Sequence, residues 1–248
     1  MEFGLFCDKE FVPTVIKALI FVAKFLGAAI AGYLSDTFGR RRTVMGGLIV
    51  ANSAGLVLRF MPRWEAFIVF WVIIHASAHL AYIAASVWVI EVVGPTKRHF
   101  GQLISIGFGV GYMLTSALAY GFPHWKNFTS SEVVLVVPVL IVIYFLPQSP
   151  RWEYLNSNPE NGLRVLQLIA TKGNVELPTE LHEQLVNATS DSTDPNKTSS
   201  NGTIIDVFRS RHFRKIAFVM GFAFIGVTCA YYGYDSYGIM QQLLFLTV

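Results

Sequence analysis

Long apolar stretches separated by short polar segments dominate the chain. Each is rich in Val, Ile, Leu, Phe and Ala and approaches the roughly 20 residues that a helix needs to cross the hydrocarbon core of a bilayer. A crossing segment must satisfy its own backbone hydrogen bonds, and stretches this long are not the alternating strands of a barrel. The pattern predicts an all-α membrane protein with six transmembrane helices, at about 11–34, 43–61, 66–90, 101–122, 131–147 and 215–234.

The composition supports a membrane protein and excludes an ordinary soluble domain. Hydrophobic residues make up 53% of the chain and charged residues only 14%, whereas a soluble domain carries about 25% charged residues. The two cysteines, Cys7 and Cys229, are too few for a disulfide framework. The predicted helix at 131–147 is the shortest and contains Pro138, which we expect to kink it.

The positions of Lys and Arg predict how the helices are oriented. Basic residues concentrate at 40–42, at Lys97 and Arg98, and along 148–214, three connections that share one side of the membrane. The alternate connections carry only Arg63 and Lys126. Because basic loops stay in the cytoplasm, we expect a multi-pass protein of the plasma membrane with 148–214 in the cytoplasm. Within that segment, Pro159–Ala170 has apolar residues at helical spacing, which predicts a short amphipathic helix.

The segment from Gly32 to Arg42, GYLSDTFGRRR, carries the most chemical content and is predicted as the loop between the first two helices. Gly32 would allow two helices to approach closely, and Gly39 would permit a tight reversal. Asp36 beside the arginines offers a charge network that can hold two helical bundles together and release them. Three arginines alone would serve as a membrane anchor, but an anchor requires neither the aspartate nor the glycines.

These residues resemble the major facilitator superfamily, whose hallmark loop reads G-x-x-x-D-x-x-G-R-R. Three further segments are similar to the organic cation/anion transporter family within it. The sugar porters share the arginine loop and the P-x-S-P-R motif, but the Tyr-Tyr-Gly sequence favours the organic ion transporters. The three segments are EVVGPTKR at 91–98, PQSPRW at 147–152 and YYG at 231–233.

The resemblance implies an architecture of twelve helices in two bundles, with the substrate bound between them and exposed alternately to each side. The first helix of this chain corresponds to the second of that family, and the last corresponds to the seventh. We therefore expect a major facilitator-type helical bundle with six of an original twelve transmembrane helices. Residues 1–147 would form a partial N-terminal bundle, 148–214 the cytoplasmic inter-bundle loop and 215–248 the first helix of a truncated C-terminal bundle.

The resemblance also implies a conformational latch on the cytoplasmic side. Gln148 departs from the family, which usually has Glu there, so one carboxylate is removed from the expected charge network. The expected latch residues are Gly32, Asp36, Gly39, Arg40, Arg41, Glu91, Gly94, Pro95, Arg98, Pro150, Arg151 and Trp152.

Polar side chains inside the predicted helices are candidates for a substrate cavity. His75 and His79 are spaced to share one helical face, which Tyr82 continues. They would line the cavity, pack as satisfied core histidines or bind a metal, and two ligands on one helix are too few for a metal. Lys24 would favour anionic substrates and Asp235 cationic ones, so the charge of the substrate stays open. The expected cavity residues are Lys24, His75, His79, Tyr82, Tyr231, Tyr232 and Asp235.

The predicted function is transport of small organic ions, by secondary or facilitated transport. Two alternatives remain: a truncated, non-transporting fragment that acts through a full-length transporter partner, and a sugar-porter-like transporter. No Walker loop, nucleophile elbow or dinucleotide fingerprint is present in the sequence, so no enzyme activity, cofactor or metal is predicted. The expected partners are a small organic ion and the lipid bilayer, and no nucleic acid.

Overall fold

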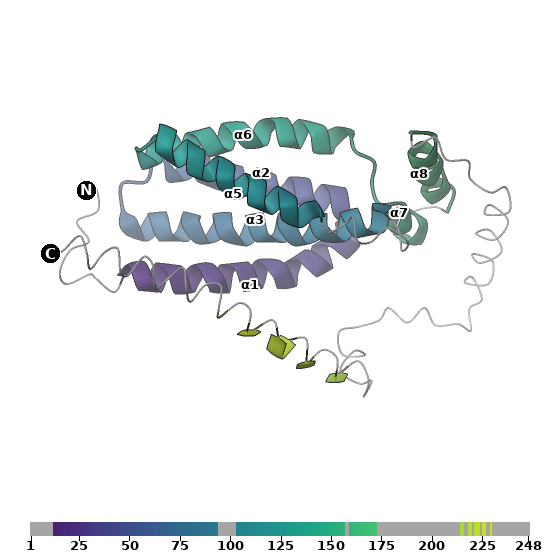
Figure 1. The fold of residues 1–248 in the computed structure, drawn as a ribbon, viewed down its shortest axis with the longest axis horizontal. Helices are drawn as coiled ribbons and strands as arrows, with labels where there is room; N and C mark the ends of the chain where they lie inside the picture. Colours follow the sequence, from purple (N-terminus) through teal and green to yellow (C-terminus); the bar gives the residue numbers. More distant parts are fainter. Residues whose placement is uncertain are drawn as a thin grey trace. The chain divides into compact units, whose positions relative to one another are not determined.

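The computed structural model describes residues 12–93, 103–156 and 159–172, and the scattered positions 214–215, 218–219, 221–223, 225–226 and 229. The chain divides into two compact units, residues 1–187 and 188–248. The described positions of the second unit are helical and exposed, and most of the sixth predicted helix lies outside the described residues. All the labelled helices belong to the first unit (Figure 1).

Five long helices and two short ones make up the described part of the first unit. The long ones lie side by side, and α7 sits at the end where α1 finishes and α2 starts (Figure 1). The links 59–63 and 122–124 lie at the opposite end. The helices are α1 (Val12–Phe38), α2 (Arg40–Leu58), α3 (Trp64–Val93), α5 (Leu103–Gly121), α6 (Trp125–Phe145), α7 (Pro150–Asn156) and α8 (Pro159–Lys172).

Three of these helices are long and apolar enough to cross a membrane: Thr14–Phe38 of α1, all of α3 and all of α6. Within the described residues this is half of the six predicted spans. Helix α2 is less apolar because it begins with three arginines and contains Asn52 and Ser53. Only 17%, 6% and 0% of the three apolar windows is buried inside the protein. Apolar surface of this extent is typical of a membrane or interaction face.

Two predicted helix boundaries need correction. The segment Gly32–Arg42 is not a loop, because α1 continues to Phe38 and only Gly39 separates it from α2. Helix α6 begins at Trp125 instead of about 131. Its polar first turns remain helical because Thr129 Oγ1 donates to the Trp125 carbonyl at 2.9 Å and Ser130 Oγ to the Lys126 carbonyl at 2.9 Å. Such bonds satisfy hydroxyl groups without breaking a helix.

Helix α3 packs closely against both α1 and α2 through glycines. A Cβ added at Gly27 would collide with the carbonyl oxygen of Ala76, and one at Gly47 would lie 2.9 Å from the carbonyl oxygen of Ser77. Neighbouring residues of α3 are therefore in backbone contact with two helices, as small residues allow in membrane proteins. Gly32 does not have the role predicted for it, since within the described residues nothing lies within 4 Å of a Cβ there.

A second set of contacts attaches α6 to α2. Gly55 faces the side chains of Val133 and Thr129 at 3.5 and 3.8 Å from the position of an added Cβ. At the end of α2, Arg59 donates to the Lys126 carbonyl oxygen at 3.4 Å and to Ser130 Oγ. Toward the other end, Val44, Ala84 and Trp88 form a small buried cluster between α2 and α3, against which Ile143 of α6 packs.

We predict opposite effects for two glycine substitutions in α1. Gly27→Ala forces Cβ into the α3 backbone and should destabilise the protein by roughly 1–3 kcal/mol, as overpacking does. Gly32→Ala is the matched control, and because Ala is about 1 kcal/mol better than Gly inside a helix it should be neutral or stabilising. The measurement is the temperature at which half of the detergent-solubilised protein remains monodisperse. Equal effects of the two changes would contradict the close α1–α3 crossing.

Candidate functional site

The connection between α1 and α2 is a single residue, Gly39, with φ of 90° and ψ of 156°. The positive φ is strained for residues that have a Cβ, which explains a glycine here. The Gly39 N–H donates to the Ser35 carbonyl at 3.1 Å, and the Thr43 N–H donates to the Gly39 carbonyl at 3.1 Å. The backbone hydrogen bonds thus continue across the corner, and Arg40 is placed on the first turn of α2.

Arg40 forms a bidentate pair with Glu91, near the end of α3. Its Nε donates to Glu91 Oε2 and its Nη2 to Glu91 Oε1, both at 2.9 Å. Nη1 donates to the Ser35 carbonyl at 2.9 Å and lies 2.9 Å from Asp36 Oδ1. The Arg40 and Glu91 side chains are 12% and 9% exposed, whereas Asp36 is 74% exposed. The pair with Glu91 is therefore the shielded one, and the pair with Asp36 contributes little.

Ser149 connects the α6–α7 link to the same carboxylate. Its hydroxyl donates to Glu91 Oε2 at 2.6 Å, and the residue is fully buried. Ser149 Oγ also accepts from the Trp152 backbone N–H at 3.3 Å, as a helix N-cap does. A carboxylate that accepts two guanidinium donors and a hydroxyl has most of its hydrogen-bonding capacity satisfied, so Glu91 joins three segments of the chain.

Gln148 caps the start of α2. Its Oε1 accepts from the Arg41 backbone N–H at 2.7 Å, and the residue is 8% exposed. Its amide nitrogen occupies the space that a side chain at position 39 would need. Helix N-termini leave backbone N–H groups without intrahelical partners, and an amide oxygen satisfies one of them. The family usually has a glutamate at this position. The glutamine found here still caps α2 through its amide oxygen.

Arg41 and Trp152 add contacts across the same corner. Arg41 Nη1 donates to the Leu146 and Tyr144 carbonyls at 3.0 and 3.3 Å, at the end of α6. Trp152 Nε1 donates to the Asp36 carbonyl at 2.7 Å, which ties α7 to the last turns of α1. We refer to the residues of this corner together as the junction network: Asp36, Gly39, Arg40, Arg41, Glu91, Gln148, Ser149 and Trp152.

The structure brings together half of the predicted latch residues. Asp36, Gly39, Arg40, Arg41, Glu91 and Trp152 belong to the junction network, and Pro150 starts α7 directly beside it. Gly94, Pro95 and Arg98 lie outside the described residues. Sequence reasoning missed Ser149, although a serine followed by proline is a signal for a helix N-cap.

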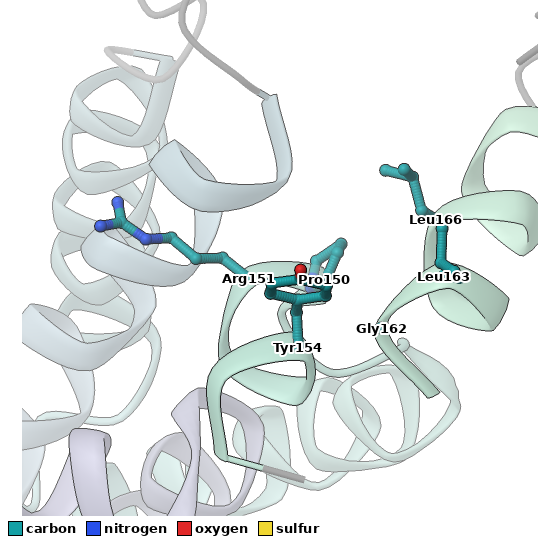
Figure 2. Close-up of a pocket in the computed structure, with 6 residues that line it drawn as sticks. All are labelled: Pro150, Arg151, Tyr154, Gly162, Leu163 and Leu166. Atoms are coloured by element: carbon teal, nitrogen blue, oxygen red, sulfur yellow. The ribbon is translucent and has the colours of Figure 1, made fainter. Parts of the chain in front are cut away.

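Arg151 lies apart from these pairs. Within the described residues it forms no ion pair or hydrogen bond, and its side chain points away from the α8 leucines (Figure 2). It borders an apolar pocket between α7 and α8, where Gly162 packs directly on the Tyr154 backbone and Leu163 is buried. Helix α8, predicted as a short amphipathic helix, thus turns part of its apolar face toward α7.

The candidate cavity residues of α3 follow one stripe of the helix. His75 Nδ1 lies 2.9 Å from the Trp71 carbonyl, and the two rings are 5.1 Å apart. The rings of His79 and Tyr82 are 5.9 Å apart, and Phe108 of α5 lies 6.3 Å from Tyr82. Among the described residues, no group of three or more His, Cys, Asp and Glu side chains is positioned to hold a metal ion.

Lys24 is the charged side chain of α1 that lies near this stripe. It is half-buried, one turn from the Gly27–Ala76 crossing, and interacts electrostatically with both His75 and His79. Its Nζ also lies 5.7 Å from the Phe21 ring centroid. The remaining predicted cavity residues, Tyr231, Tyr232 and Asp235, lie outside the described residues.

Comparison with solved structures identifies the fold. The chain resembles the inward-open xylose transporter XylE from E. coli, with a TM-score of 0.59, 19% identity, and coverage of 74% of this chain and 46% of that one. A partially occluded form of the same transporter gives a TM-score of 0.54 at 20% identity, over 72% of this chain and 48% of that one. The described helices therefore have the all-helical, major facilitator-like fold of XylE.

Sequence comparison gives the family. Residues 8–245 match the family described as Sugar (and other) transporter, and the chain belongs to it. This is a family of transporters and not of enzymes. Relatives include a Drosophila melanogaster organic cation transporter protein, 24% identical over 94% of this chain and 43% of its own length. Human solute carrier family 22 member 13 is 26% identical over 94% of this chain and 41% of its own length.

A plant protein extends the comparison to the whole chain. The Arabidopsis thaliana organic cation/carnitine transporter 4 is 26% identical over 100% of this chain and 48% of its own length. The chain thus spans less than half the length of these curated relatives. The similarity to organic cation transporters, predicted from the motifs as part of an organic cation/anion family, is confirmed as distant homology.

The junction network predicts different outcomes for two changes at Gln148. Gln148→Leu leaves the partly buried Arg41 N–H without its acceptor and should destabilise the protein by roughly 1–3 kcal/mol. Gln148→Glu keeps an acceptor oxygen beside the helix N-terminus and two arginines, so stability should be equal or higher. Thermal denaturation of the detergent-solubilised variants measures both. A Glu variant as unstable as the Leu variant would show that capping is not what Gln148 provides.

Proposed function

We propose that the chain acts in the transmembrane transport of small organic ions by alternating access, and that the junction network is its conformational latch. The supporting observation is the shielded bidentate pair of Arg40 and Glu91 at the corner between α1 and α2. Buried charges that are paired and hydrogen-bonded are costly to separate, so the network is suited to hold the connected elements in one arrangement.

The junction network contains contacts that stay closed during transport and one contact that opens. Glu91 joins α3 to α2 through Arg40 and to the α6–α7 link through Ser149. These elements therefore move as one body during transport. Asp36 is 74% exposed and keeps a carboxylate oxygen available. In the proposed mechanism it contacts the other half of the transporter when the side of the membrane next to α7 closes, and that contact breaks when this side opens.

The proposed orientation places the junction network in the cytoplasm and the protein in the plasma membrane. The arginines at 40–42, together with Arg151 and Arg164, lie at the α7 end of the helices, whereas Arg59, Arg63 and Lys126 lie at the other. Residues 148–214 are then the cytoplasmic connection between two bundles. Substrate binds between the bundles, where we place the polar stripe of α3 and Lys24.

A second candidate function is association with a full-length transporter, in which case the chain does not transport by itself. The two candidates differ in uptake by the chain alone and in the effect of co-expressing it with a full-length relative.

The latch is tested by uptake of labelled tetraethylammonium and benzoate into vesicles that contain the chain. Arg40→Gln should lower the uptake rate about tenfold, because Arg40 positions the Asp36 carboxylate at 2.9 Å. A loss of about 1.4 kcal/mol in the preference between two conformations changes their ratio tenfold. Arg42→Gln removes the same charge from the neighbouring turn and should leave uptake within about twofold. Uptake is normalised to the amount of each variant in the vesicles, because Arg40→Gln leaves the buried Glu91 carboxylate without its charged partner.

Two results separate the alternatives. Equal uptake in the Arg40 and Arg42 variants would refute the latch. Absence of uptake by the chain alone, combined with altered transport by a co-expressed full-length relative, would replace the first candidate function by the second.

The proposed orientation predicts which side labels single cysteines. In a background with Cys7→Ser and Cys229→Ser, a cysteine at Asn156 should react with an impermeant maleimide only after the membrane is opened. A cysteine at Pro62 should react in intact cells. The reason is that α7 and the 59–63 link lie at opposite ends of the helices (Figure 1). Labelling of Asn156→Cys in intact cells would reverse the assignment.

A further inference from the structure

Glu132 is an acidic side chain inside the membrane-crossing helix α6, and the junction network does not use it. Helices α3 and α6 both begin at the end opposite α7, with Trp64 and Trp125 (Figure 1), and tryptophans at helix ends are typical of the membrane–water boundary. Glu132 follows Trp125 by seven residues, which places it roughly 10 Å farther along the helix. Half of the hydrocarbon core is about 15 Å thick, and a glutamate side chain is too short to reach back to the boundary as lysine does.

The Glu132 side chain belongs to the side of α6 that faces the protein. By helical spacing it shares that side with Trp125, two turns earlier, whose ring lies 5.7 Å from the Phe67 ring of α3, edge to face. Val134 and Ile141 occupy the opposite side of α6 and are 68% and 55% exposed, as expected of positions that contact lipid. Glu132 itself is half-buried. The carboxylate is therefore directed toward the helices and not toward the lipid.

Within the described residues, no partner compensates the charge of Glu132. There its carboxylate accepts no hydrogen bond and forms no ion pair, unlike Glu91, which is bound to Arg40 and Ser149. An ionised carboxylate held among apolar side chains without a partner is costly, and such a group takes up a proton instead of staying charged. Acidic residues inside a membrane usually mark a proton or ion pathway.

The ionisable groups on the neighbouring elements do not supply that partner. Arg59 of α2 is bonded to the first turn of α6, where the Lys126 ammonium lies 5.3 Å from a tryptophan ring. On α3, Glu65 is exposed in the first turn, and His75 Nδ1 lies 2.9 Å from a carbonyl oxygen of its own helix. Helix α5 contains no Asp, Glu, Lys, Arg or His. In the part of the chain that the structure describes, none of these side chains pairs with Glu132.

Polar side chains lead from the start of α6 to this carboxylate. Thr129, Ser130 and Ser131 occupy the turns between Trp125 and Glu132, and each hydroxyl donates to a carbonyl oxygen of the same helix at 2.7–2.9 Å. A hydroxyl that donates in this way keeps lone pairs that accept hydrogen bonds from water. Water can therefore approach Glu132 from the Trp125 end, whereas beyond it residues 133–137 are all valine or leucine.

We propose that Glu132 is a proton-binding residue that couples transport by this chain to a proton gradient. Its carboxylate takes up a proton from the water at the Trp125 end and becomes a neutral carboxylic acid. When alternating access exposes this level to the other side, water hydrates the group and the same proton leaves to that side. The assignment rests on the proposed transport function, for which it names the coupling ion.

The site is tested first without transport, by labelling the chain in lipid nanodiscs with dicyclohexylcarbodiimide. This apolar reagent modifies protonated carboxylic acids and spares ionised carboxylates. Glu132 should be modified at neutral pH, and labelling should fall as the pH is raised. Glu65 is the comparison within the same chain, because an exposed glutamate loses its proton at about pH 4.3 and should stay unmodified. Peptide mass spectrometry locates the adducts.

Uptake into proteoliposomes then tests the coupling. Labelled tetraethylammonium and benzoate are the probes, with a proton gradient imposed or removed by a protonophore. If one proton moves per cycle, a gradient of one pH unit should change the accumulation of substrate up to about tenfold. Glu132→Gln keeps the shape of the neutral acid but cannot release a proton, so it should remove this response. Glu65→Gln is the matched control and should keep it.

The outcomes separate the proton site from the transport function. Labelling of Glu132 without uptake supports the site and contradicts transport by this chain alone. Uptake without labelling of Glu132, or equal labelling of Glu65 and Glu132 at neutral pH, overturns the site and leaves transport standing. A gradient response that persists in Glu132→Gln, or that is missing from the unchanged chain, overturns the coupling. Glu132→Asp retains an acid and should still be labelled at position 132, which keeps the proposal testable if Glu132→Gln fails to fold.

Discussion

The bidentate pair between Arg40 and Glu91 is the interaction on which the arrangement of the helix ends depends. It is shielded from solvent on both sides, and Ser149 adds a third donor to the same carboxylate. Removing one partner would leave the other charge buried and uncompensated, which costs far more than the pair contributes. The pair therefore adds little net stability, but it strongly favours the one arrangement of α2, α3 and the α6–α7 link in which both charges are paired.

Backbone contacts at glycines hold the rest of the helices in register with that pair. Gly27 and Gly47 bring α1 and α2 onto adjacent residues of α3, and Gly55 brings α2 onto α6. These contacts leave most apolar side chains facing outward, as the low burial of the three membrane-crossing windows shows. In a bilayer, close packing and hydrogen bonds hold helices together, since lipid tails are as apolar as the side chains. This fold relies on close packing at the glycines and on the hydrogen bonds of the junction network.

Much of this architecture was predictable from the sequence, and the remainder depends on contacts between distant residues. The apolar stretches predicted the long helices because their length matches a bilayer, and leucine spacing predicted α8. The end of α1 was misplaced because Asp36 and the arginines look like a loop until their partners are known. Gly32 was predicted to allow close approach and Gly27 was missed, because spacing along one helix does not say which face meets a neighbour. Likewise, the sequence shows only that Gln148 lacks the family's carboxylate. Its capping role depends on the Arg41 N–H, which comes beside it only in the fold.

The single-residue corner at Gly39 leaves the chain no slack between α1 and α2. Consecutive Cα atoms are about 3.8 Å apart, so the last residue of α1 and the first of α2 stay within two such steps of one another. A displacement of α1 along its axis must therefore draw Arg40, and with it Glu91, in the same direction. Movement at the Val12 end of α1 therefore cannot be absorbed at the corner and is transmitted to the junction network at the Phe38 end.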